Sequence, residues 1–288
     1  MTTLCDLHTH THFSDGTFSP AELIAEAERV GLSAVALCDH NTINGLPAFL
    51  EAAKNSSVEA IPAIEFSTDY RMENGQKMEL HIVALFVRPE HYDSITAMVA
   101  PNVENKIKSN HALISALQAN GYDITYDEVC AERQGNINRA HVAAILTKKG
   151  YTASCSEAFQ TVLSPERGFY VEPDRLPVWD VIKFIRSIGA VPVLAHPLLT
   201  FKKNERALRT FLDKALPCGL LAMETRYSTN DQETTALAHS IAIEYGLCES
   251  GGSDFHAANK PDIALGSGKG NLAVPYEFLV KLRALAFK

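Results

Sequence analysis

The 288-residue sequence lacks the features that mark secreted, disulfide-bonded or membrane-spanning proteins. Its six cysteines are scattered without a Cys-x-x-Cys pair, a usage that favours free thiols in a reducing compartment. The first residues contain neither the basic nor the apolar segment of a signal peptide. The longest apolar stretch, Gly189 to Leu199, is too short to cross a bilayer. We therefore expect a cytoplasmic protein without a membrane partner.

Positive charge is also scarce, since 26 lysines and arginines face 34 aspartates and glutamates and the net charge is −8. This balance disfavours long-range attraction to nucleic acid and argues against a long duplex as the partner. The segment from Gly266 to Gly270 is no phosphate-binding P-loop, because Lys269 is followed by glycine and an upstream glycine is missing. For an anionic substrate, metal ions or a few arginines must supply the positive charge.

The sequence is rich in short apolar runs that alternate with amphipathic helical patterns. Ser19 to Glu22, for example, forms a capping box with proline at the first helical position, and the helix that follows stops at Gly31. Such alternation predicts βα units and an α/β fold with a parallel sheet or barrel. Seven strands are expected, at Leu4–Leu7, Ala34–Cys38, Glu59–Ala63, Met78–Phe86, Val191–Ala195, Leu220–Glu224 and Leu247–Ser250.

The rhythm changes in the middle of the chain. Helical patterns cover 102–120, 140–149 and 156–163, and no strand pattern stands between Val99 and Arg175. We interpret residues 101–175 as a helical insertion. The remaining residues, 1–100 and 176–288, then form one discontinuous barrel domain.

Histidines and carboxylates gather at the expected strand ends, which is where α/β barrels carry their chemistry. The set comprises His8, His10, Asp15, His40, Glu65, His81, His196, Asp254 and His256. Each alone has a structural explanation, such as a core histidine or an Asx-turn at Asp15. Together, imidazoles and carboxylates without cysteine suit divalent Mn, Fe, Zn or Co. Nine ligands exceed the needs of one ion, so we expect two or three ions, with Glu65 or Asp254 bridging.

These motifs resemble those of the polymerase and histidinol phosphatase (PHP) family. The matching segments are Asp6–Gly16, Cys38–Asn41, Ile64–Ser67, Leu80–Val83, Ala195–Pro197 and Gly252–His256. The resemblance implies a distorted seven-stranded (β/α) barrel with a trinuclear centre, often of manganese and sometimes with iron or zinc. Carried over to this sequence, it gives one ion to His8, His10, Glu65 and Asp254, a second to Glu65, His81 and His196, and a third to Asp15, His40 and His256.

The inserted helices are similar to those of the stand-alone branch of the family that contains the nucleoside 3′,5′-bisphosphate phosphatase. In that branch the insertion forms a cap, and its arginine in an Arg-x-His motif contacts a substrate phosphate. The resemblance therefore implies this role for Arg139, whose alternative is a solvated helix start. His141 either orients the phosphate or caps the helix. Arg226 departs from the family pattern, and is either a second phosphate clamp or a partner of Glu224.

The resulting hypothesis is a metal-dependent hydrolase that uses a metal-activated hydroxide to remove the 3′-phosphate of a nucleoside 3′,5′-bisphosphate. Glu65, His196 and Asp254 are its predicted catalytic residues, with His196 a candidate for the leaving-group acid. The alternatives are a 5′-to-3′ exonuclease on short 5′-phosphorylated RNA, a histidinol phosphatase, and a metal-stabilised binding or scaffold domain. The expected partner is a small nucleotide or short oligonucleotide, and no protein partner is evident.

Overall fold

The computed structural model describes residues 3–131 and 137–287, and the chain divides into two compact units. Unit 1 comprises Met1–Val99 and Leu176–Lys288, and unit 2 comprises Ala100–Arg175. Among the described residues, no helix combines the length and the apolar character that a bilayer crossing requires.

Unit 1 is built on one mixed sheet that contains nine strands in the described part of the chain. They are β1 (Leu4–Thr9), β2 (Ala34–Leu37), β3 (Glu59–Arg71), β4 (Lys77–Leu85), β5 (Leu176–Pro177), β6 (Val191–Leu194), β7 (Ala222–Tyr227), β8 (Cys248–Gly252) and β9 (Val274–Pro275). Their order is β8-β7-β6-β4-β3-β2-β1-β9, with β5 paired to β3. The seven expected strands are all present, but the expected count is wrong, because the two-residue strands β5 and β9 extend the sheet.

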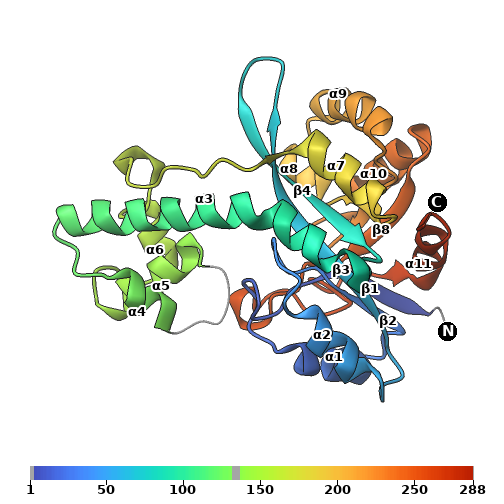
Figure 1. Ribbon diagram of the computed structural model, residues 1–288, viewed down its shortest axis with the longest axis horizontal. Coiled ribbons are helices and arrows are strands. Elements are labelled where there is room, and N and C mark those ends of the chain that lie inside the picture. Colours follow the sequence, from blue (N-terminus) through green and yellow to red (C-terminus); the bar gives the residue numbers. More distant parts are fainter. Residues whose placement is uncertain (1–2, 132–136, 288) are drawn as a thin grey trace. The chain divides into compact units, whose positions relative to one another are not determined.

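The principal strands do not all run in the same direction. β1, β2 and β3 run parallel, as do β6, β7 and β8, whereas β4 is antiparallel to both β3 and β6. Only residues 72–76 separate β3 from β4, and a connection this short joins only antiparallel strands. The hairpin projects past its neighbours in the sheet (Figure 1), because β3 continues eight residues beyond its expected end at Ala63.

The sheet nearly closes into a barrel where the segments after β1 and β8 meet. The backbone nitrogen of His10 donates to the oxygen of Phe255 at 2.9 Å, and that of Asp254 donates to the oxygen of His8 at 2.9 Å. Gly252 permits this approach, since a Cβ atom there would lie 2.5 Å from the backbone nitrogen of His8. The first and last principal strands are thereby held side by side.

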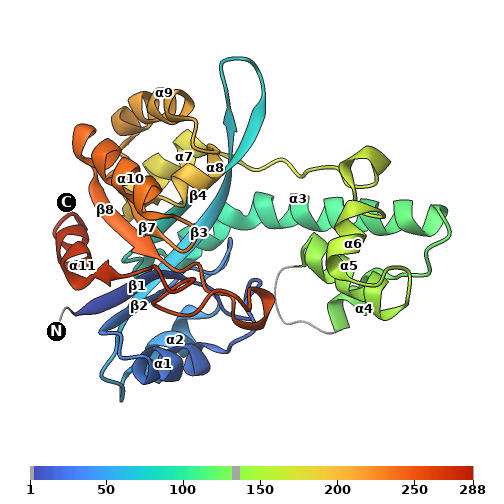
Figure 2. The ribbon, with the colours of Figure 1, turned by 180° about the vertical axis from the view of Figure 1, so that it is seen from behind.

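Helices surround the sheet of unit 1, as the two opposite views in Figures 1 and 2 show. They are α1 (Pro20–Arg29), α2 (Leu46–Ala53), α7 (Val178–Ser187), α8 (Pro197–Thr200), α9 (Glu205–Ala215), α10 (Gln232–Glu244) and α11 (Tyr276–Arg283), with 3₁₀ turns at Pro89–His91, Leu216–Cys218 and Ala257–Asn259. The expected capping box of α1 is confirmed, because Ser19 and Glu22 satisfy each other's backbone nitrogens. The helices bury apolar residues such as Leu23, Ile182 and Phe211 against the strands.

The regular secondary structure in the described residues of unit 2 is all helical. The long helix α3 (Tyr92–Ala119) begins in unit 1 and continues into unit 2, followed by α4 (Tyr126–Ala131), α5 (Arg139–Lys148), α6 (Cys155–Gln160) and a 3₁₀ turn at Pro165–Arg167. Leu113, Leu117, Val142 and Leu146 are buried in a core of its own. The first inserted helix starts ten residues earlier than expected, and Pro101 lies inside it.

Candidate metal centre

Glu65, on β3, lies at the middle of the cluster of candidate ligands. Its side chain is buried, and its two oxygens face five imidazoles. Oε2 lies 3.2 Å from Nε2 of His8, 3.3 Å from Nε2 of His10 and 3.0 Å from Nδ1 of His40, while Oε1 lies 3.0 Å from Nδ1 of His81 and 3.2 Å from Nε2 of His196. One carboxylate thus connects five imidazoles from four other segments of the chain.

Two further carboxylates complete the cluster. Oδ1 of Asp254 lies 3.2 Å from Nε2 of His10 and 3.4 Å from Nδ1 of His256. Oδ1 of Asp15 lies 3.1 Å from Nε2 of His256 and 3.9 Å from Nε2 of His40. All nine sequence-predicted ligands are therefore brought together in unit 1 by contacts of 4 Å or less.

Buried carboxylates outside the nine hold the ligand-bearing loops in place. Asp6 accepts hydrogen bonds from the backbone nitrogens of Ser253 at 2.9 Å and Gly266 at 2.8 Å. Asp39 accepts from the backbone nitrogen of Thr11 at 2.8 Å and from the hydroxyl of Ser14 at 2.7 Å. These bonds tie the segments after β1, β2 and β8 to one another, which fixes the approach of their side chains.

Two of the candidate ligands sit in strained backbone. His196 and Asp254 have φ angles of 33° and 57°, in the left-handed region that non-glycine residues rarely adopt. Each stands just after a strand, β6 or β8, where the chain turns sharply. Strain of this kind persists where surrounding contacts enforce it, and it is concentrated at functional sites.

Three groups within the cluster have the composition and closeness of metal sites. In each group one ligand atom per residue lies within 4.8 Å of the others. The groups are His10, Asp15, His40 and His256; His8, His10 and Glu65; and His40, Glu65 and His81. The expected partition differs from these groups in four memberships. It adds Asp254 to the group of His8 and His196 to the group of His81, and it leaves His10 out of the group of Asp15 and His40 out of the group of Glu65 and His81.

The donor atoms fit divalent metal ions. Nε2 of His8, Nε2 of His10 and Oε2 of Glu65 are buried, face one another and make no hydrogen bond within the described structure. Unsatisfied buried polar atoms are rare in native proteins and call for a physical partner. A cation satisfies all three at once, and a nitrogen and oxygen donor set without cysteine is the set that Mn, Fe, Zn and Co share.

Electrostatic coupling shifts the titration of the cluster. Burial lowers the pKa of His10 and His81, but the facing carboxylates outweigh it and raise these pKa values to about 9 and about 10. Burial dominates at His40 and lowers its pKa to about 3. Burial opposes ionisation of Glu65, yet the imidazoles of His8 and its neighbours hold the pKa of that carboxyl well below its usual range. Without metal, the carboxylates therefore retain protons on several imidazoles.

Two further predicted site residues, Arg139 and His141, belong to unit 2. Arg139 is the first residue of α5 in unit 2, and its guanidinium stacks 4.2 Å from the ring centre of Tyr170. His141 accepts a hydrogen bond from the backbone nitrogen of Asn138 at 3.1 Å, so it caps α5, which was one of its two expected roles.

Arg226 belongs to β7 in unit 1. It lines a separate pocket of about 620 Å³ with α10 residues such as Thr235 and His239. The contacts of both Glu224 oxygens go to other groups, namely His8 and the backbone of His196, so the alternative of a pairing between Arg226 and Glu224 gains no support. A bulge in β7 lies between these two residues and shifts their register.

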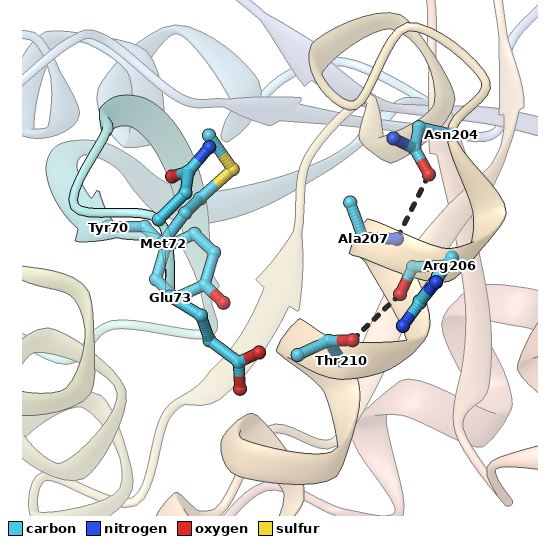
Figure 3. Close-up of a pocket in the computed structure, with 8 residues that line it drawn as sticks. Tyr70, Met72, Glu73, Asn204, Arg206, Ala207 and Thr210 are labelled. Carbon is cyan, nitrogen blue, oxygen red and sulfur yellow. Dashed lines mark hydrogen bonds between the residues drawn. The ribbon is translucent and has the colours of Figure 1, made fainter.

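A second pocket, of about 400 Å³, lies between the β3–β4 hairpin and α9 (Figure 3). Tyr70, Met72 and Glu73 form one side, and α9 residues including Arg206 and Thr210 form the other. It contains none of the nine candidate ligands, so the cluster is a separate feature of the barrel.

Sequence reasoning missed Glu224 as a member of the centre. Its Oε1 lies 2.8 Å from Nδ1 of His8, and its Oε2 accepts from the backbone nitrogen of His196 at 2.6 Å. The signal was present, since Glu224 follows the same strand-end pattern as the nine ligands.

Comparisons with known proteins agree with this geometry. The PHP domain family model matches residues 6–175, more than half of the chain. The chain is 30% identical to a 5′-3′ exoribonuclease of Haemophilus influenzae over 89% of this chain and 91% of the relative. It is 27% identical to a 3′,5′-nucleoside bisphosphate phosphatase of Chromobacterium violaceum over 88% and 87%. A solved structure from Bifidobacterium adolescentis, assigned as a metal-dependent phosphoesterase, matches with a TM-score of 0.85 and 26% identity over 99% of this chain and 97% of that one.

Proposed function

The chain belongs to the PHP domain family and is a hydrolase of phosphoric ester bonds, and from this premise we propose that it removes the 3′-phosphate of a nucleoside 3′,5′-bisphosphate. The observation that carries the proposal is the nine-residue cluster around Glu65, with its unsatisfied buried donor atoms. The similarity to the bisphosphate phosphatase of Chromobacterium violaceum supports this substrate class. The membership sets aside the alternative of a non-enzymatic scaffold.

The nine residues are proposed to hold two or three divalent ions, with manganese the expected metal. When bound, such ions lower the pKa of a coordinated water toward about 7 and neutralise charge on the phosphoryl oxygens. Uncatalysed monoester hydrolysis is so slow that an enzyme must lower the barrier by on the order of 20 kcal/mol or more. A side-chain acid or base contributes only about 10²- to 10⁴-fold, which is too little by itself.

The chain's own residues prepare this site. Glu65 and Asp254 present carboxylate oxygens to several imidazoles at once, which suits them to be shared between ions. His196 places Nε2 toward Glu65 while Nδ1 contacts the hydroxyl of Thr200 at 3.0 Å, so its ring orientation is fixed. Glu65, Asp254 and His196 are therefore the proposed catalytic residues.

Arg139 is the proposed ligand of the phosphate that is not cleaved. Its guanidinium carbon lies 4.2 Å from the ring centre of Tyr170, and this cation–π contact holds the group in place. A planar guanidinium of this kind matches two phosphate oxygens. The helical insertion, 101–175, is accordingly proposed to act as a substrate-binding cap. His141 caps α5 directly beside Arg139, which positions that helix start.

The test follows phosphate release from adenosine 3′,5′-bisphosphate by manganese-reconstituted protein. We expect phosphate and 5′-AMP, at a rate well above that with 3′-AMP or 5′-AMP. Arg139→Gln is expected to raise KM for the bisphosphate at least tenfold. Arg167→Gln is the matched control, because Arg167 also lies over an aromatic ring, that of Phe169 at 5.1 Å. Absence of phosphate release from the bisphosphate would refute the proposed substrate.

A second candidate is 5′-to-3′ exonuclease action on short 5′-phosphorylated RNA. It is favoured by the 30% identity to the Haemophilus influenzae exoribonuclease. The same panel separates the two by comparing a short RNA with a 5′-phosphate against the same RNA with a 5′-hydroxyl. Release of mononucleotides only from the phosphorylated strand, with no turnover of the bisphosphate, would favour the exonuclease. Histidinol phosphate completes the panel.

A further inference from the structure

Glu224 is a buried carboxylate on β7 that belongs to none of the three metal-like groups. Its carboxylate nevertheless contacts two of the nine candidate ligands, namely the imidazole of His8 and the backbone nitrogen of His196. We propose that Glu224 is a positioning residue that fixes the proton of His8 on Nδ1, so that Nε2 presents its lone pair to a metal ion. The inference rests on the proposed metal centre and extends it beyond the nine ligands.

The two nitrogens of His8 have different surroundings. Nδ1 lies 2.8 Å from Oε1 of Glu224, whereas Nε2 lies 3.2 Å from Oε2 of Glu65 and 3.8 Å from Oδ1 of Asp254. An ionised carboxylate only accepts hydrogen bonds, so Nδ1 must be the nitrogen that donates to Glu224. Nε2 makes no hydrogen bond and points at the carboxylates that would share an ion with it.

The second oxygen of Glu224 makes the arrangement specific. Oε2 accepts a hydrogen bond at 2.6 Å from the backbone nitrogen of His196, which is a permanent donor. Both oxygens of Glu224 must therefore accept a hydrogen bond. A carboxylate meets this condition, whereas the amide of glutamine has only one oxygen and does not. Ligating histidines commonly donate their second ring nitrogen to such a carboxylate, which sets the tautomer and raises ligand basicity.

This asymmetry predicts the behaviour of Glu224→Gln. The amide oxygen of glutamine will face the N–H of His196, because that partner can only donate. The NH₂ group will then face His8, and Nδ1 must accept from it. The proton of His8 is thereby moved to Nε2, which removes the lone pair needed for metal. The size and packing of the side chain remain nearly the same.

The experiment measures binding of Mn²⁺ to metal-free protein by equilibrium dialysis, without substrate, with circular dichroism as a check of folding. We expect Glu224→Gln to weaken binding of one ion by about 10- to 100-fold. Glu249→Gln is the matched control, since Glu249 also faces a histidine Nδ1, that of His239 at 3.0 Å, but neither residue is among the nine ligands. It should bind Mn²⁺ like the wild type.

A double-mutant cycle tests the route through His8. In a His8→Ala background, Glu224→Gln should cause little further loss of Mn²⁺ affinity, because its effect requires the imidazole. Wild-type affinity in Glu224→Gln would overturn the inference, as would an undiminished additional loss in the His8→Ala background. A wild-type protein that binds no Mn²⁺ would overturn the metal centre itself, whereas Mn²⁺ binding without bisphosphate turnover would overturn only the proposed substrate.

Discussion

Asp254 divides its two oxygens between different tasks. Oδ1 faces the imidazoles of His10 and His256, whereas Oδ2 accepts from the hydroxyl of Tyr227 at 2.8 Å and from Nζ of Lys260 at 2.6 Å. Burial, followed by the Asp254 charge, raises the pKa of Tyr227, so its hydroxyl stays a neutral donor. The two donors on Oδ2 hold Oδ1 toward the cluster.

Tyr227→Phe removes one of these donors while keeping the ring. We expect the free energy of unfolding to fall by about 1–2 kcal/mol, since a buried hydrogen bond to a charged group is lost. Affinity for Mn²⁺ should fall several-fold, because Asp254 is held less firmly. Denaturant titration and equilibrium dialysis measure the two effects. Tyr276→Phe, which loses a hydrogen bond to Glu59 and contacts none of the nine ligands among the described contacts, is the control. Unchanged Mn²⁺ affinity in Tyr227→Phe would contradict the argument.

Protons compete with metal for the imidazoles. The pKa of His10 is raised to about 9 and that of His81 to about 10, so both are protonated at pH 7 in the metal-free protein. Metal uptake must release these protons, and apparent affinity should rise as pH increases from 6 to 9. Calorimetry in buffers of different ionisation enthalpy counts the protons. Metal affinity that is independent of pH over this range would show that the ligands are already neutral.

The same shifts make an opposite prediction for the metal-free fold. A histidine whose pKa is raised by folding stabilises the folded state below its unfolded pKa of about 6.5. That contribution is lost as pH rises through the folded values near 9 and 10. The metal-free protein should therefore lose stability progressively as pH rises from about 6.5 to about 10, as measured by urea titration at successive pH values. Stability that increases over this range would contradict the raised values.

At the scale of elements, the closure of the barrel depends on close contact between β8 and β1. A Cβ atom on Gly252 would lie 2.4 Å from the Cβ atom of His8. A Cβ atom cannot move without its backbone, so this overlap cannot be relieved by a change of rotamer. Gly252→Ala should cost about 1–3 kcal/mol through overpacking and displace His8 enough to weaken Mn²⁺ binding. Thermal unfolding and dialysis measure both. Gly75→Ala, in the exposed β3–β4 turn with open space around it, should leave metal binding unchanged.

The elements also show what sequence could and could not predict. Strand ends and helix caps are local, so the seven principal strands and the start of α1 at Ser19 were predictable from short patterns. Strand direction depends on loop geometry, which short sequence patterns do not show. The continuation of β3 to Arg71 could not be predicted either, because it depends on pairing with the antiparallel strand β4. The bulge in β7 leaves no local signal either. It places Tyr227 beside Asp254, and it separates Arg226 from Glu224.

At the scale of the whole molecule, the nine ligands were predictable because their chemistry repeats at successive strand ends, while their supporting contacts were not. Those contacts, such as Glu224 to His8 or Lys260 to Asp254, join segments far apart in the chain. They depend on how the barrel closes, which no single segment encodes. Sequence therefore predicts which side chains meet a metal more readily than it predicts what holds them there.

Metal binding should stabilise unit 1 as a whole, because all nine ligands belong to it. At a free Mn²⁺ concentration of 1,000 Kd the gain is about 4 kcal/mol per ion, which corresponds to a rise in Tm of roughly 8–16 °C for a domain of this size. The single tryptophan, Trp179, lies in α7 and stacks on Phe211, so its fluorescence reports unfolding of unit 1 alone. We expect the Tm followed by Trp179 to fall on treatment with EDTA and to recover with Mn²⁺. The Asp15→Ala variant lacks one ligand, so its Tm should recover less on addition of Mn²⁺ than that of the wild type. A Tm that EDTA does not change would contradict the stabilisation of unit 1 by bound metal.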